Sequence, residues 1–164
     1  PNITKVEETG DTFLENAFLK AKNYFQQTKV PCIADDGGLM VDYLNGAPGV
    51  KSNRFLGYSA TDQELAESIL EKLRDVPKEK RTARLGGFIV FYDGKNTLKK
   101  ENWLEGYITE SSLGKVPDNF PYRAILMIPQ FGKLYGDLTH EEHEEVNFRR
   151  RNLKALKGDI IKLL

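Results

Sequence analysis

The sequence predicts an α/β fold in which helices flank a mixed, twisted sheet, and two kinds of periodicity support it. Apolar residues recur with helical spacing in three segments, residues 11–29, 61–76 and 139–156. Residues 84–92 and 97–109 instead have the alternation of strands, and Asp93-Gly94 between them is a strong turn signal. A chain of 164 residues with 40% apolar content can build one substantial core. We therefore expect a single domain over residues 1–164 that contains a long β-hairpin.

Each expected helix begins at a capping box, in which a threonine and a glutamate three residues later exchange hydrogen bonds with the backbone. The pairs are Thr12 with Glu15, Thr61 with Glu64, and Thr139 with Glu142. After the first helix, the apolar residues 32–34 fit a buried strand that leads directly into Asp35-Asp36-Gly37-Gly38. We expect this acidic pair at the carboxyl end of that strand, and a further strand over residues 39–44. Residues 116–129 mix aromatic and turn residues and are not assigned.

Composition excludes several classes of function. Lys+Arg and Asp+Glu balance at 24 each, so no overall field favours nucleic acid or an anionic membrane. No apolar run approaches the roughly 18 residues of a spanning helix, and no signal segment opens the chain, so we expect a cytoplasmic protein. Cys32 is the single cysteine and there are two histidines, which excludes a Cys/His zinc site within one chain. Because the first residue is Pro1 and not Met, we expect that a preceding segment was cleaved or is missing.

Three carboxylates form a candidate metal site. Asp35 and Asp36 follow a strand, and Glu15 lies on the helix just before it, so a short connection keeps the three close. Oxygen ligands of this kind suit Mg²⁺, with Mn²⁺ as an alternative, and such ions also bind substrate phosphates. Two structural readings compete with this hypothesis. Asp-Asp-Gly-Gly is ordinary turn chemistry, and Glu15 can simply cap its own helix.

The last helix and the unassigned segment contribute further candidates. Arg149 falls within the apolar stripe of its helix, and a buried guanidinium needs a protein carboxylate or a ligand phosphate or carbonyl. An internal salt bridge or a snorkelling side chain explains Arg149 equally well. Phe120 and Tyr122 can stack on a nucleobase, although such residues more often belong to the core.

Nearly the whole chain resembles the inosine triphosphate pyrophosphatase family, which removes non-standard purine nucleoside triphosphates, and the first half of the chain does so most specifically. The resemblance rests on three stretches, residues 6–22, residues 33–39 and Gly46-Ala47-Pro48-Gly49-Val50. It implies the fold of that family, hydrolysis of a nucleoside triphosphate between the α- and β-phosphates, and a homodimer. It also implies that Glu15 and Asp36 bind the metal and that Asp35 or Asp36 helps to activate the attacking water. The apolar loop of residues 46–58 is a plausible dimer contact.

The second half departs from the family pattern at ligand-reading positions. Asn119-Phe120-Pro121-Tyr122-Arg123-Ala124 stands where the family has Gly-Phe-Gly-Tyr-Asp-Pro, and Asn147-Phe148-Arg149 stands for Ser-His-Arg. Gly37 replaces the serine of Asp-Asp-Ser-Gly, and the family's opening strand has no counterpart. By the resemblance the substrate-binding positions are Phe120, Tyr122, Arg123, His143, Phe148 and Arg149, with His143 in place of a lysine. We therefore expect altered or relaxed base specificity.

Two functions from different classes follow. The first is a metal-dependent nucleoside triphosphate pyrophosphatase, because the carboxylates of the expected site are present. The second is a non-catalytic nucleotide-binding or dimer-partner protein on the same fold, because a fold does not fix a function. Nucleic-acid binding through Arg149-Arg150-Arg151 ranks last, since the chain as a whole is neutral.

Overall fold

The computed structural model describes residues 3–111 and 120–163, except for the side chains of residues 53 and 54. Its helices are α1 (Phe13–Thr28), α2 (Asp62–Lys72), α3 (His140–Val146) and α4 (Phe148–Ile161). Its strands are β1 (Cys32–Val41), β2 (Thr82–Tyr92), β3 (Thr97–Ile108), β4 (Leu126–Ile128) and β5 (Lys133–Leu134). Among these residues no helix is long and apolar enough to cross a membrane.

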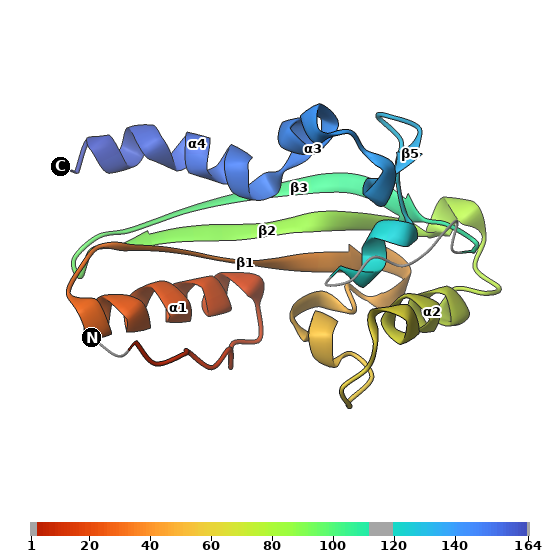
Figure 1. Ribbon diagram of the computed structural model, residues 1–164, viewed down its shortest axis with the longest axis horizontal. Coiled ribbons are helices and arrows are strands. Elements are labelled where there is room, and N and C mark those ends of the chain that lie inside the picture. The colour runs from red at the N-terminus through yellow and green to blue at the C-terminus, as the bar shows by residue number, and fades with distance from the viewer. Residues whose placement is uncertain (1–2, 112–119, 164) are drawn as a thin grey trace. The chain divides into compact units, whose positions relative to one another are not determined.

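One five-stranded sheet takes its strands in chain order, β1-β2-β3-β4-β5. β4 pairs antiparallel with both of its neighbours, with Tyr107 opposite Met127 and Met127 opposite Leu134. The arrows of β1, β2 and β3 alternate in direction in Figure 1. The α/β class, the flanking helices and the long hairpin are confirmed. The strands pair antiparallel, whereas a mixed sheet with both parallel and antiparallel pairs was expected.

Local signals explain the hairpin and the helix starts. At the hairpin turn the Asp93 carboxylate accepts hydrogen bonds from the backbone N–H groups of Lys95 and Asn96 at 2.8 and 2.6 Å, and Gly94 takes a positive φ of 95°. The two capping boxes expected at α1 and α2 are both present, and Thr139 with Glu142 forms the corresponding bonds at α3.

The single last helix expected over residues 139–156 is wrong, because the chain breaks at Asn147 into α3 and α4. The Asn147 side chain accepts a hydrogen bond from the Arg150 backbone N–H at 3.1 Å and so caps a new helix. The break rotates the apolar stripe of α4. Its buried residues are Phe148, Asn152 and Leu156.

The acidic pair lies in the middle of β1, and the strand end expected there is wrong. Gly37 and Gly38 are strand residues and not a turn. A Cβ on Gly37 would come within 2.4 Å of the Gly86 carbonyl oxygen, and one on Gly87 within 2.2 Å of the Asp36 carbonyl oxygen. Glycine is needed here because β1 and β2 approach too closely for side chains.

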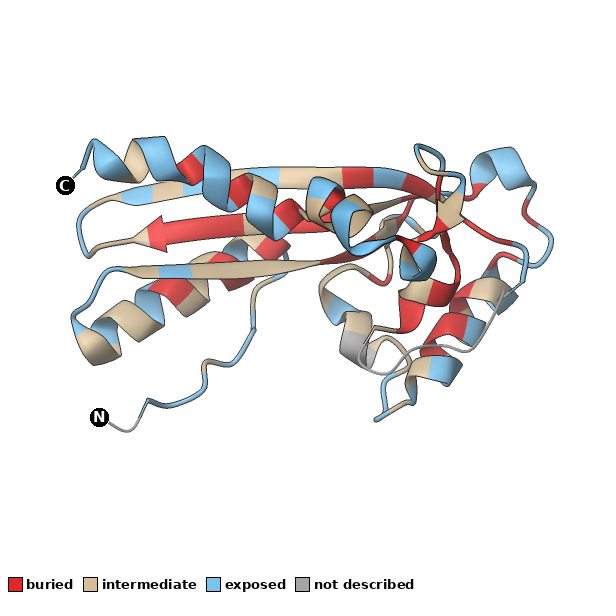
Figure 2. Ribbon diagram, turned by 45° about the horizontal axis from the view of Figure 1, so that its top comes forward, coloured by how far each residue is buried: buried red, intermediate tan, exposed pale blue. Residues whose placement is uncertain are grey.

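The chain divides into two compact units, of which the first comprises residues 1–37, 86–103 and 147–164 and the second residues 38–85 and 104–146. In the first, α1 packs Ala17 and Ala21 against Val90 of β2. In the second, buried residues of α2, including Ala66 and Ile69, pack with strand residues and with the segment that follows residue 119 (red in Figure 2). The single-domain assignment stays a prediction.

Candidate functional site

Asp35 and Asp36 point to opposite faces of β1, because successive side chains of a strand alternate. Asp35 accepts a hydrogen bond from Arg149 of α4, with 2.5 Å between Oδ2 and Nε. Asp36 accepts one from Lys20 of α1, with 3.1 Å between Oδ1 and Nζ. α1 and α4 lie on the two sides of the strand (Figure 1). The adjacent acids therefore supply one carboxylate to each face.

A cluster of Glu8, Lys20 and Asp36 lies on the face covered by α1. Lys20 Nζ is 2.8 Å from Oε1 of Glu8 and 3.1 Å from Oδ1 of Asp36, so one ammonium joins two carboxylates. The side chains of Lys20 and Asp36 are only 17% and 14% exposed, whereas that of Glu8 is 41% exposed. Solvent therefore screens the Lys20–Asp36 contact least. The cluster combines hard oxygen donors with a cation that can meet a phosphate.

The environment shifts both buried members of this cluster. Burial raises the pKa of Asp36 above its ordinary value, and this effect outweighs the opposing charge of Lys20. Burial acts to lower the pKa of Lys20, but the hydrogen bonds and charges of Glu8 and Asp36 together raise it. Lys20 thus stays charged at neutral pH. An ionised carboxylate with a raised pKa is a stronger proton acceptor, which suits Asp36 to general-base chemistry.

Glu15 is engaged at the start of its own helix. Its Oε2 accepts the backbone N–H groups of Asp11 at 2.8 Å and Thr12 at 3.0 Å, which is the capping reading of this residue. Glu15, Asp35 and Asp36 therefore contact different partners and do not form one cluster here, and the metal-binding and catalytic roles expected of them stay predictions. Over residues 3–111 and 120–163, no group of three His, Cys, Asp or Glu residues is placed to hold a metal ion. Asp35 faces away from Asp36 because successive side chains of a strand alternate, and the carboxylate of Glu15 is engaged in capping its own helix.

Sequence reasoning assigned no role to Glu8 or Lys20. One signal was available, because Asn16 and Lys20 are four residues apart and share the inward face of α1 with Ala17 and Ala21. Asn16 is 1% exposed, accepts the Gly10 N–H at 2.7 Å and hydrogen-bonds Asp36. Polar residues on a buried helix face need partners, and here the partner is a strand carboxylate. Glu8 lies before the helix and carried no such local signal.

Arg149 is half exposed, so its expected place in the buried stripe is wrong. Its side chain is 54% exposed and pairs with Asp35, the protein carboxylate that the sequence allowed as one partner. Its guanidinium carbon also lies 4.6 Å from the ring centroid of Phe148, which is buried. The change follows from the break at Asn147, which restarts the helical period one residue before Phe148.

Four of the expected substrate-binding residues gather in the second unit. Phe120, Arg123 and His143 contact Tyr135, a residue that sequence reasoning missed, and Tyr122 contacts the Phe120 ring. The Phe120 and Tyr135 rings are 5.8 Å apart, and His143 meets Tyr135 edge-on at 4.7 Å. Tyr122 is 2% exposed and donates its hydroxyl to the Ser52 carbonyl oxygen at 3.2 Å. Tyr122 is therefore a core residue, and its predicted stacking on a base stays untested.

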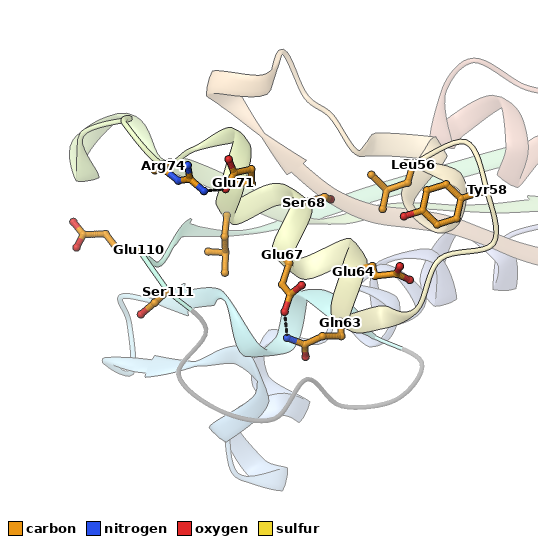
Figure 3. A pocket seen from close by; sticks show the side chains of 11 residues that line it. Leu56, Tyr58, Gln63, Glu64, Glu67, Ser68, Glu71, Arg74, Glu110 and Ser111 are labelled. Atoms are coloured by element: carbon orange, nitrogen blue, oxygen red, sulfur yellow. Dashed lines mark hydrogen bonds and ion pairs between the residues drawn. The ribbon is translucent and has the colours of Figure 1, made fainter.

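A hollow of about 780 Å³ runs along α2, and none of the expected site residues lines it. Figure 3 shows that its acidic side chains come mainly from α2, with Glu67 hydrogen-bonded to Gln63. Its one basic residue, Arg74, is already paired with Glu71. Glu64 and Glu110 add further negative charge. Carboxylates at this density repel a polyphosphate, so this hollow is a poor nucleotide site.

Comparison with known proteins gives a consistent result. A profile described as the Ham1 family matches residues 1–159. The dITP/XTP pyrophosphatase of Salmonella paratyphi A (strain ATCC 9150 / SARB42) is 42% identical over 158 residues, which cover 94% of this chain and 79% of that protein. The dITP/XTP pyrophosphatase of Escherichia coli (strain K12) is 40% identical with the same coverage.

Solved structures agree with this result. The Ham1 protein of Staphylococcus aureus has a TM-score of 0.87 and 30% identity, covering 98% of this chain and 82% of that one. A nucleoside-triphosphatase, dITP/XTP pyrophosphatase, from Mycobacterium abscessus has a TM-score of 0.80 and 33% identity, covering 95% and 82%. The profile, the relatives and the folds all point to one assignment, and the chain belongs to the Ham1 family.

Proposed function

We propose that this protein is a divalent-metal-dependent nucleoside triphosphate pyrophosphatase, which hydrolyses its substrate to a nucleoside monophosphate and pyrophosphate. The observation that carries the proposal is the buried Lys20–Asp36 pair with Glu8, in a chain whose relatives are named dITP/XTP pyrophosphatases. Base specificity that is altered or relaxed and assembly as a homodimer remain parts of the proposal that rest on sequence.

The residues of the cluster fit a hard divalent cation such as Mg²⁺. The carboxylates of Glu8 and Asp36 lie close together, because both contact the Lys20 ammonium, and Lys20 would turn towards the substrate when the two acids hold an ion. They are oxygen donors, and together they carry one more charge than Lys20 balances. Glu8 and Asp36, and not Glu15, would thus hold the ion. When bound, such an ion neutralises phosphate charge and lowers the pKa of a coordinated water.

The side chains divide the remaining work. Asp36 would accept a proton from the attacking water, because burial raises its pKa and so improves its basicity. Lys20 donates to a phosphate oxygen and stabilises the negative charge that develops in the transition state. Asn16 keeps the Asp36 carboxylate in position from a fully buried site. Hydrolysis needs no covalent intermediate in this arrangement, since water attacks directly.

Asp36→Asn tests the role of the general base. The substitution removes one charge without leaving a cavity, so the fold should persist while Mg²⁺-dependent release of pyrophosphate from inosine triphosphate falls by about a hundredfold or more. Asp75→Asn is the matched control, because Asp75 is exposed and undergoes the same chemical change. Turnover by Asp36→Asn at the level of the control would reject the proposed role. If the unaltered protein released no pyrophosphate from any nucleotide, the non-catalytic alternative would stand.

A second pair of variants decides between Glu8 and Glu15 as metal ligands. Glu8→Gln should raise the Mg²⁺ concentration needed for half-maximal activity by about tenfold, because the number of charged ligands tunes the affinity of such sites. Glu15→Gln should leave it unchanged, because glutamine still serves at this position of a capping box. A raised Mg²⁺ requirement in Glu15→Gln alone would restore the sequence-based assignment.

A further inference from the structure

The Lys20 ammonium lies between two carboxylates that come from different segments of the first unit. Glu8 precedes α1 and Asp36 belongs to β1, and Nζ of Lys20 is 2.8 Å from the first and 3.1 Å from the second. Within the described residues, Lys20 is the one cation that pairs with these two acids. An ammonium with two carboxylate neighbours balances the same negative charge that a divalent ion would balance.

Burial makes this contact strong enough to compete with an ion. The Lys20 and Asp36 side chains are 17% and 14% exposed, so water and salt screen their attraction less than on an open surface. Burial acts to lower the pKa of Lys20, yet the hydrogen bonds and charges of Glu8 and Asp36 hold that pKa above its ordinary value. Lys20 therefore stays a cation, and it repels a second cation placed at the same carboxylates.

Lys20 is also the member of the cluster that can move. Asp36 is fixed in a strand and receives a hydrogen bond from Asn16, which is 1% exposed. A lysine ammonium is carried on a flexible four-carbon stem, and it binds phosphate as a point charge. A phosphate chain thus offers Lys20 a new anionic partner. When Lys20 turns to it, the carboxylates of Glu8 and Asp36 lose their internal cation.

We propose that Lys20 is an internal cation that blocks the Glu8–Asp36 site in the free protein, and that a phosphate chain opens the site by drawing the ammonium away. The inference rests on the proposed function and concerns the regulation of the same site. Metal and polyphosphate then bind cooperatively, and each raises the affinity for the other by the same factor. The free protein binds divalent ions weakly and gains its metal together with its substrate.

Binding of Mn²⁺ alone, followed by the electron paramagnetic resonance of the free ion, tests the block. Lys20→Met should bind Mn²⁺ at least about tenfold more tightly than the unaltered protein, because the repelling charge is gone. Lys22→Met is the matched control on the exposed side of α1, and it should leave the affinity unchanged although it removes the same charge. Adding Asp36→Asn to Lys20→Met should abolish the gain.

A thermal measurement supports the comparison where Lys20→Met is less stable. Mn²⁺ should raise the Tm of Lys20→Met more than that of the unaltered protein, since a ligand that binds the folded state stabilises it according to its affinity. Lys20→Gln, which removes the charge but keeps a donor, should show a gain in the same direction. Equal or weaker Mn²⁺ binding in both variants would overturn the proposal and identify Lys20 as a residue that positions the carboxylates.

Tripolyphosphate tests the opening step. At saturating tripolyphosphate the tenfold gain of Lys20→Met should vanish, because Lys20 has then left the acids in the unaltered protein as well. A gain that persists unchanged would overturn the coupling. None of these measurements needs turnover, so they separate the two proposals. Release of pyrophosphate by a protein whose Mn²⁺ affinity does not respond to Lys20→Met would refute this inference alone, whereas the expected Mn²⁺ shifts without turnover of any nucleotide would refute the proposed function alone.

Discussion

Replacing Lys20 with methionine should show how much the ammonium between Glu8 and Asp36 contributes to the free energy of unfolding. Methionine keeps the length of the side chain but leaves Asp36, which is 14% exposed, without its ammonium partner. A hydrogen bond to a buried charged group contributes about 1.5–3 kcal/mol, and the half-exposed contact with Glu8 adds less than about 1 kcal/mol. We therefore expect a loss of about 2–3 kcal/mol, which for a domain of this size lowers the Tm by roughly 4–12 °C.

The pH dependence gives this prediction a distinctive signature. In Lys20→Met, burial raises the pKa of Asp36 without the opposing charge and hydrogen bond of Lys20, so the folded state favours the protonated carboxyl. A raised carboxyl pKa contributes stability below the unfolded value and loses it as pH rises through the folded value. The variant should therefore be least stable, relative to the unaltered protein, at neutral pH and above. The difference should shrink as the pH falls towards the range in which Asp36 is protonated.

Urea unfolding at pH 5 and pH 8 measures both effects, followed by the fluorescence of Trp103, the single tryptophan. Lys22→Met is the control on the same helix, because Lys22 is exposed and its ammonium lies 5.9 Å from the centroid of the Phe18 ring. The double variant Lys20→Met with Asp36→Asn should recover about 1 kcal/mol or more, since no buried charge is left unpaired. Strict additivity, or a loss below about 0.5 kcal/mol at pH 8, would refute the reasoning.

Two further predictions concern the second unit. Arg81 is 1% exposed and donates to the carbonyl oxygens of Leu73, Val76 and Thr109, so Arg81→Met should cost about 3–5 kcal/mol in urea unfolding; a cost within 1 kcal/mol of Arg74→Met would contradict this. Burial and the charge of Arg123 lower the pKa of His143, so stability should decline as pH falls below 6.5, where the unfolded state takes up the proton first. His143→Gln should flatten that decline between pH 5 and 7, and an unchanged slope in thermal melts would show that another group causes it.

The elements of the fold that depend on neighbouring residues could be predicted from the sequence. Thr12 with Glu15 and Thr61 with Glu64 act over three residues, and both boxes form as expected. Asp93-Gly94 determines the hairpin turn through bonds within four residues. The break at Asn147 was missed for the opposite reason. The residues around Asn147 fit a continuous helical period in the sequence. The hydrogen bond that the Asn147 side chain accepts from the Arg150 N–H marks the start of α4 after α3.

The site required information that no local pattern contains. Gly37 was read as part of a turn, but it lies in a strand because the backbone of β2 passes within contact distance of it. This change from turn to strand alters the interpretation of the two acids. In a turn the side chains of Asp35 and Asp36 can lie close together, whereas in a strand they point to opposite faces. Lys20 then reaches Asp36 across 16 residues of sequence and Glu8 across 12. Glu15 has a local partner in Thr12, so its carboxylate is engaged at the start of its own helix. A carboxylate without a local partner, such as Glu8 or Asp36, remains available for chemistry, and this difference in local engagement is what the paired Glu8→Gln and Glu15→Gln experiment measures.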